Sequence, residues 1–339
     1  MPNWHIHQKS GKNINMKKIL SLMLVLGLVC FGFSASSAQA AGNVKVKNAA
    51  LKAQVLATTD VTNTPPTVNS ISIQDAVTLS TTYITPATGA TKNVIITAEI
   101  ADPNGCSEET GVTVKFFQNS TSSAGAADNP NNHYSAAMNL DSCTGSNPTS
   151  TWSATIPVDY YANPSSGMPS SWVATVTPSD TEVGTPSSTN IFMNQSNGLS
   201  VNDTISYGAL AAGAYTPNGQ NQTTTVTNIG NTALAVTLTN YGITSSDGYA
   251  MVCTKDASPS GTIPATNEKF SIDSSANYSG VPLPMTSLAG NSSINSGLNI
   301  PKRTDGVSSA PVYWSLGLPA TGVSGSCQGY VNFAAGYGI

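Results

Sequence analysis

The segment Asn93-Val-Ile-Ile-Thr-Ala-Glu-Ile-Ala101, followed by Asp102-Pro-Asn-Gly105, decides the fold class of this chain. Its apolar side chains recur at every second position, at Val94, Ile96, Ala98 and Ile100. Successive side chains of a β-strand point to opposite faces, so this period indicates a strand with one buried face. The sequence Asp-Pro-Asn-Gly is typical of a turn, because Pro fixes φ and Asn and Gly tolerate turn conformations. The segment therefore predicts a half-buried strand that ends in a tight turn.

Runs of the same period recur along the chain, separated by clusters of Pro, Gly, Asn and Ser. They cover residues 112–116, 152–156 and 173–177, the last with Val173 and Thr175 in phase, and later 223–228, 233–239, 312–318 and 327–334. In the last two runs we expect shared faces formed by Val312, Trp314, Leu316 and Leu318, and by Cys327, Gly329, Val331 and Phe333. Many short strands with such punctuation predict antiparallel sandwiches or barrels. We therefore expect an all-β protein with two tandem antiparallel sandwich modules, residues 67–197 and 198–339.

A hairpin is indicated by Thr225-Val-Thr-Asn-Ile-Gly-Asn231 and the alternating run Ala233-Leu-Ala-Val-Thr-Leu238 that follows it. This motif resembles the hairpin of immunoglobulin-like domains in secreted bacterial and archaeal surface proteins, including the cell-adhesion-related bacterial type. Residues 94–117 resemble bacterial immunoglobulin-like repeats more loosely. The resemblance implies an immunoglobulin-like (Ig-like) sandwich and a location at the cell surface. It assigns no catalytic or binding residue.

Residues 16–40 have the pattern of a signal peptide. Two lysines precede the apolar run 19–33, and Ala38-Gln-Ala40 then offers the small–x–small site that a signal peptidase cuts. The alternative is a transmembrane anchor, but the apolar run is shorter than the roughly 20 residues that a spanning helix needs. We therefore predict cleavage between Ala40 and Ala41.

The predicted cleavage places the mature chain in the periplasm, at the cell surface or in the medium. Residues 1–15 are then an upstream extension, and residues 41–66 are a flexible tail and linker. No second long apolar run follows, so we expect no membrane span after cleavage. The first 40 residues hold four of the 13 basic residues and none of the 17 acidic ones, which leaves a net charge of −8. Such a charge opposes binding to nucleic acid, because that binding requires neutralisation of phosphates.

Four cysteines remain after removal of the leader, and they allow three pairings. Their spacing favours Cys106–Cys143 and Cys253–Cys327, because each pair then lies within one module. Such disulfides persist in an oxidising compartment, and each would stabilise the fold by roughly 3–4 kcal/mol in the chain-entropy model. The alternative is a zinc site. It is disfavoured because the chain has no Cys-x-x-Cys spacing and only His133 in its mature part.

One loop of the first module gathers oxygen atoms that suit calcium. The candidate ligands are Asp102, Asn104, Glu108 and Glu109, with Asp141 brought close by the Cys106–Cys143 disulfide. Calcium takes six to eight oxygens, and the acidic loop of an EF-hand is absent from this sequence. We therefore predict no cofactor, with calcium as the one metal candidate.

No group of residues matches a known catalytic arrangement. A Ser-His-Asp hydrolase would have to use His133, which lies in a predicted turn without a Gly-x-Ser-x-Gly elbow, so we expect a surface histidine. Trp152 and Trp314 are in phase with aliphatic neighbours, which favours core packing. Tyr160 and Tyr161 are the best candidates for exposed ligand contacts. We predict that the protein is not an enzyme.

These features favour a secreted structural or adhesive protein of the cell surface, such as a subunit of an extracellular filament or surface layer. Its expected partners are copies of itself, other surface proteins or glycans. An extended tail such as residues 41–60 would add a strand to a neighbouring subunit. A second interpretation is a secreted carbohydrate- or protein-binding accessory module. A third, disfavoured by the missing catalytic set, is a hydrolase with an unfamiliar site.

Overall fold

The computed structural model describes residues 56–144, 148–165, 170–201, 204–280 and 283–338. The contact pattern divides the chain into Met1–Asp60 and Val61–Ile339, and only residues 56–60 of the first unit are described. The predicted signal peptide, its Ala40–Ala41 cleavage site and most of the predicted tail lie outside the described residues. Within the described ranges, no helix is long and apolar enough to cross a membrane.

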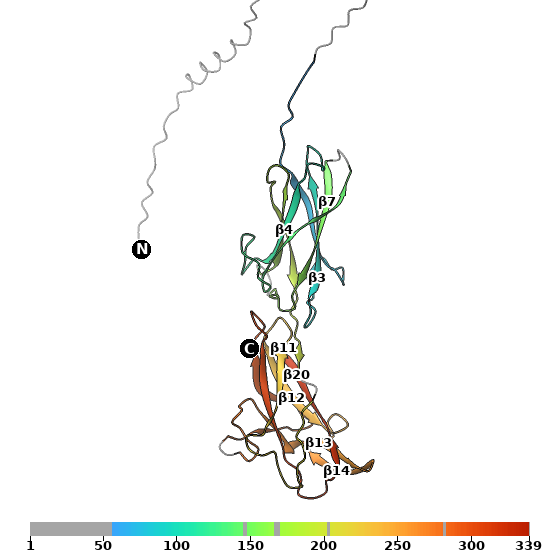
Figure 1. Ribbon diagram of the computed structural model, residues 1–339, viewed down its shortest axis with the longest axis vertical. Helices are drawn as coiled ribbons and strands as arrows, with labels where there is room; N and C mark the ends of the chain where they lie inside the picture. Colours follow the sequence, from blue (N-terminus) through green and yellow to red (C-terminus); the bar gives the residue numbers. More distant parts are fainter. Residues whose placement is uncertain (1–55, 145–147, 166–169, 202–203, 281–282, 339) are drawn as a thin grey trace, which may run out of the picture. The chain divides into compact units, whose positions relative to one another are not determined.

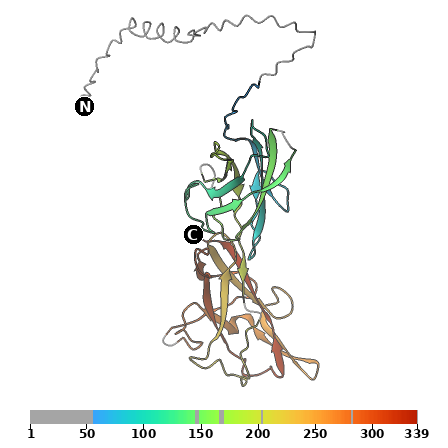
Figure 2. The ribbon, with the colours of Figure 1, turned by 45° about the horizontal axis from the view of Figure 1, so that its top comes forward.

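The second unit consists almost wholly of antiparallel β-sheets, as the alternating runs predict (Figure 1). Its strands fall into two groups, one between residues 67 and 193 and one between residues 199 and 337, and both views show them (Figure 2). In the first group, a four-stranded sheet has the order β1 (Thr67–Asp75), β3 (Lys92–Ala101), β7 (Thr149–Val158), β6 (Asn139–Cys143). A five-stranded sheet has the order β2 (Tyr83–Ile84), β9 (Ser187–Met193), β8 (Trp172–Ser179), β4 (Gly111–Gln118), β5 (His133–Ala137).

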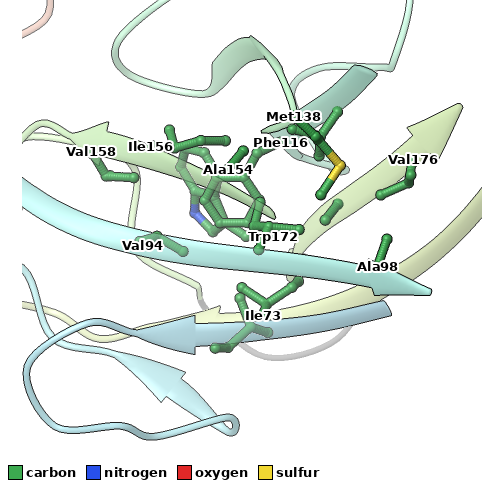
Figure 3. Close-up of a cluster of buried hydrophobic side chains, with 14 of the residues drawn as sticks. Ile73, Val94, Ala98, Phe116, Met138, Ala154, Ile156, Val158, Trp172 and Val176 are labelled. Atoms are coloured by element: carbon green, nitrogen blue, oxygen red, sulfur yellow. The ribbon is translucent and has the colours of Figure 1, made fainter. Parts of the chain in front are cut away.

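Side chains from both sheets of the first group meet in one hydrophobic core (Figure 3). Val94, Ile96 and Ile100 of β3 are fully buried, as their alternation predicts. From the opposite sheet, Phe116 of β4 packs against Trp172 of β8 with ring centroids 5.0 Å apart. The first group is therefore a β-sandwich, in agreement with the predicted fold class.

Strand β8 has a different phase from the one its sequence suggested. Its buried side chains are Trp172, Ala174 and Val176, whereas Val173 and Thr175 lie on the outer face. The indole N–H of Trp172 donates a hydrogen bond to the carbonyl oxygen of Asn163 at 2.8 Å, so the ring is buried with its polar atom satisfied. Burial of the large indole therefore decides which face of β8 points inward.

The second group contains three sheets. The largest has the order β10 (Leu199–Ser200), β11 (Gln222–Asn228), β18 (Ser309–Leu316), β15 (Glu268–Ser271), β16 (Thr286–Ser287). The others have the orders β17 (Ile294–Ile300), β12 (Leu234–Tyr241), β20 (Tyr330–Tyr337) and β14 (Ser258–Pro264), β13 (Tyr249–Lys255), β19 (Ser326–Gln328). A single 3-10 turn, Ala265–Asn267, precedes β15 in the described chain.

The core of the second group follows the predicted alternation. Val226, Leu238 and Trp314 are fully buried, and Trp314 donates a hydrogen bond from Nε1 to Thr224 Oγ1 at 2.8 Å. Leu316 is buried in a smaller, separate cluster with Ala250, Cys253 and Ile263, and Leu318 is only partly buried at the edge of that cluster. The cores of the two strand groups share no residue among the described positions.

The predicted strand 327–334 is wrong as a single element. The chain passes from β19, which pairs with β13, to β20, which pairs with β12. The change of sheet occurs at Gly329, where an added Cβ would lie 1.8 Å from the carbonyl oxygen of Ala250. Only glycine allows the two backbones to approach so closely, and the resulting bend moves the chain from one sheet to the other.

Both disulfides favoured by the sequence are present. Cys106–Cys143 joins the loop after β3 to the end of β6, across a sequence separation of 37 residues. Cys253–Cys327 joins directly opposite residues of β13 and β19, across a separation of 74 residues. Each bridge therefore closes a loop within one strand group.

Candidate functional site

A groove lies beside β5, the terminal strand of the five-stranded sheet. It has a volume of about 270 Å³ and runs between β5 and β7, which belong to different sheets. Its lining comes from the turn before β5, from β5 itself and from the end of β7: Asp128, Asn129, Pro130, His133, Tyr134, Ser135, Ala136, Thr155, Ile156 and Pro157. The groove thus lies at one open side of the sandwich.

The strand register shows which backbone groups of β5 face the groove. The carbonyl of Asn132 accepts from Gln118 N, and Met138 N donates to the carbonyl of Val112, so even-numbered residues bond to β4. In an antiparallel pair, the N–H and C=O of the intervening residues point the other way. The backbones of Ser135 and Ala137 therefore face the open edge. On the far side of the groove, β6 pairs with β7 only as far as Ser153.

A carboxylate is fixed at the mouth of the groove. Asp128 Oδ1 accepts hydrogen bonds from Ser135 Oγ at 2.5 Å and from His133 Nδ1 at 2.9 Å. The Asp128 side chain is 58% exposed, and the Ser135 hydroxyl is the main cause that lowers the pKa of its carboxyl. Asp128 is therefore an anion at neutral pH, held in one position by two donors.

His133 does not lie at the surface, so that expectation is wrong. The ring is fully buried and stacks on Phe117 with centroids 5.9 Å apart. The turn causes this burial, because Asn129 and His133 exchange backbone hydrogen bonds and fold the chain back over the ring. Asp128 stands between Ser135 and His133, whereas a hydrolase needs the histidine between the serine and the acid. These three residues therefore form a positioning network and not a proton relay for Ser135.

The predicted calcium ligands make separate contacts. Asp102 is buried and accepts from Asn104 N at 2.8 Å, which closes the predicted Asp-Pro-Asn-Gly turn. Asn104 Oδ1 accepts in turn from Thr64 N at 2.8 Å. Glu108 N donates to the carbonyl of Gly105 at 3.0 Å. These residues therefore support the loop through local bonds.

The other two candidates face β7. Glu109 Oε2 accepts from Trp152 Nε1 at 2.7 Å, and Asp141 Oδ1 accepts from Ser153 Oγ at 2.8 Å. Within the described residues, no group of three or more His, Cys, Asp or Glu side chains is placed to hold a metal ion. The geometry therefore does not bring the five predicted ligands together into one site.

Tyr160 and Tyr161 are not the exposed pair that the sequence suggested. Their rings contact edge to face at 4.9 Å, but Tyr161 is only 6% exposed, and Arg303 lies 4.5 Å above its ring. Tyr160 is half-buried. The face of the Tyr161 ring is therefore covered by the guanidinium of Arg303, which comes from the second strand group. Sequence spacing could not reveal this contact.

Lys302 makes the neighbouring contacts. Its Nζ donates to Asn131 Oδ1 at 2.8 Å and to the carbonyl of Tyr161 at 3.2 Å. Asn131 Nδ2 donates back to the carbonyl of Thr304 at 2.7 Å. Burial lowers the pKa of the Lys302 amine to about 8. The loop after β17 therefore binds the loops of the first group at several points.

The segment 225–231, which the sequence predicted as a hairpin, supplies a second junction. Asn231 accepts from Ser196 N at 2.7 Å and donates from Nδ2 to the carbonyl of Asn194 at 2.9 Å. Ile229 adds backbone bonds to Gly89 and Gly198. Gly230 fits closely here, since an added Cβ would lie 2.2 Å from the carbonyl oxygen of Ser196. The predicted hairpin is wrong, because β11 pairs with β10 and β18 while β12 pairs with β17 and β20, so the two strands belong to different sheets. The motif instead connects two sheets and binds the segment between the two strand groups.

No family model matches the chain, and no curated protein matches it. Among solved structures, it is similar to the CsuC–CsuE chaperone–tip adhesion subunit complex from archaic chaperone-usher Csu pili of Acinetobacter baumannii. That match has 10% identity, covers 76% of this chain and 97% of that chain, and has a TM-score of 0.33.

Two further structures match less well. The Streptococcus agalactiae AgI/II polypeptide BspA C-terminal domain has 9% identity, 80% and 97% coverage and a TM-score of 0.20. A chimeric titin Z1Z2 carrying a decorin peptide has 10% identity, 74% and 96% coverage and also a TM-score of 0.20. Scores this low establish neither a shared domain arrangement nor a shared function.

Proposed function

We propose that this chain is a secreted structural or adhesive protein of the cell surface, which assembles with copies of itself. The observation that carries the proposal is the pair of β-strand groups, each with buried cores of its own and each with its own disulfide. Disulfides of this kind suit an oxidising compartment outside the cytoplasm. The predicted signal peptide gives the same location from an independent part of the sequence.

Open strand edges support assembly as the mode of action. β20 is a terminal strand of eight residues without a charged side chain. β5 is also terminal and borders a groove. Such edges present backbone groups that pair readily with another chain, and many soluble proteins protect them with charge or proline. We propose no catalytic activity, because the network around Asp128 lacks the order of a hydrolytic triad.

Fractionation of native cells followed by electron microscopy of the protein-containing fraction tests this function. We expect the protein in the surface or shed fraction, as ordered polymers or a lattice. Deletion of residues 41–60 should abolish those assemblies. A soluble monomer in the periplasm or medium would contradict the proposal and favour a secreted binding module. A glycan array that gave hits lost in Tyr160→Ala would then support carbohydrate binding.

A further inference from the structure

We infer that the groove between β5 and β7 is the acceptor site for residues 43–55 of a second copy of the chain, whose Val44-Lys-Val-Lys47 pairs with the edge of β5. This inference rests on the proposed function, because it assumes that copies associate. It assigns the acceptor surface, which that function leaves open.

The open edge of β5 has the length of a short strand. The backbones of His133, Ser135 and Ala137 face away from β4, but His133 already exchanges hydrogen bonds with Asn129. Only Ser135 and Ala137 are therefore available to an added strand. Beyond Ala137 the chain leaves for β6. In an antiparallel pair, hydrogen bonds recur at every second position. A strand that bonded to both Ser135 and Ala137 would therefore pair with β5 over about four of its own residues. The segment Val44–Lys47 has this length.

The two faces of β5 match the alternation of Val-Lys-Val-Lys, because one face is apolar and the other lies beside a carboxylate. Tyr134 and Ala136 point inward and pack against the core, beside Ile156 across the groove. Ser135 points outward and binds Asp128. In a strand added next to β5, alternate side chains face the same two sides. Val44 and Val46 would therefore enter the apolar groove, and Lys45 and Lys47 would lie on the side of the Asp128 carboxylate.

The opposite edge of the groove is a poorer acceptor. Pro157 of β7 has no N–H to donate to an added strand, whereas Ser135 and Ala137 each offer a donor and an acceptor. The charges also agree, because Asp128 is anionic and the segment 43–55 carries Lys45, Lys47 and Lys52 with no acidic residue. Opposite charges on neighbouring strands stabilise pairing.

The test uses the mature full chain and measures self-association by sedimentation velocity. Ala137→Pro removes an N–H that faces the groove and leaves the bonds to β4, so we expect the association constant to fall roughly tenfold. Ala137→Ser keeps the N–H and should associate like the wild type. Lys45→Glu with Lys47→Glu should weaken association, and adding Asp128→Lys should restore it.

A photo-reactive p-benzoylphenylalanine in place of Thr155, which lines the groove, then identifies the occupant. A crosslink to residues 43–55 of another copy supports the inference, including for the case in which Ala137→Pro fails to fold. Normal association of folded Ala137→Pro, or a crosslink to another segment alone, would overturn the acceptor site while leaving the proposed function intact. A wild-type chain that remained monomeric in solution and on cells would overturn both.

Discussion

Glu268 is an acidic side chain with only 2% of its surface exposed. Its oxygens accept hydrogen bonds from Tyr207 Oη at 2.7 Å and from Asn240 Nδ2 at 2.9 Å. Burial outweighs these bonds and raises the pKa of Glu268 above its ordinary value of 4.5. This burial could not be predicted from the sequence, because the short run around Glu268 has no clear period.

The raised pKa of Glu268 predicts a pH-dependent stability. Since the folded protein holds this proton more tightly than the unfolded chain, the free energy of unfolding should fall as pH rises above about 4.5. Glu268→Gln removes the ionisation and should flatten this slope, while retaining an oxygen that accepts a hydrogen bond. Urea unfolding of both proteins over a pH series measures the effect. Equal slopes in the two proteins would show that Glu268 does not titrate in this range.

Asn228 organises the connection between β11 and β12, which belong to different sheets. It is fully buried, donates from Nδ2 to the carbonyls of Thr232, Ile300 and Pro301, and accepts from Gly230 N. Asn228→Ala leaves these groups without partners and should lower the free energy of unfolding by about 3 kcal/mol. Asn332→Ala, at an exposed position of β20, is the matched control and should change it by less than about 0.5 kcal/mol. Comparable losses in both variants would refute this role.

At the scale of elements, the sequence predicted the strands better than their ends. Val94 to Ile100 and Val312 to Leu316 were placed correctly, because a period of two reports directly on burial of one face. The phase of β8 was wrong, because Val173 and Trp172 are both apolar and only the packed core decides between them. The break at Gly329 depends on a backbone approach from β13, a distant part of the chain.

The same limit applies to the candidate site. The disulfide pairing followed from spacing, since each pair closes a loop within one module. The groove could not be predicted, because it forms where β5 and β7 of different sheets diverge. His133 was misplaced for a related reason. Its turn signal was correct, but burial under the folded turn depends on contacts with Phe117 and Asp128.

Gly329 permits a direct test of the change of sheet. Gly329→Ala places a methyl group against the Ala250 carbonyl and should lower the free energy of unfolding by about 2 kcal/mol or more. Gly125→Ala adds a methyl group into open space and serves as the control, with an expected change near zero. Denaturant unfolding of the two variants measures both effects. Equal stability of the two would mean that the bend between β19 and β20 adapts without cost.

For the whole molecule, the two junctions decide whether the disulfide-closed cores of the second unit unfold together. One consists of Asn231 with the segment around Ser196, and the other of Lys302 with Asn131 and Tyr161. Both consist of hydrogen bonds between the two strand groups, so unfolding of one core breaks bonds that hold the other.

Loss of these bonds should therefore separate the unfolding of the two cores. We expect calorimetry of the wild type to show one transition, and Lys302→Ala combined with Asn231→Ala to show two, since each core keeps its own disulfide and packing. Lys255→Ala, outside both junctions, should keep one transition. Burial lowers the pKa of Lys302 to about 8, so the folded protein binds fewer protons than the unfolded chain above that pH. The wild type should accordingly gain stability as pH rises from about 8 to the ordinary value of 10.5, and the Lys302→Ala variants should not. A wild type with two transitions, or a double variant that still unfolds in one, would show that these contacts do not couple the cores.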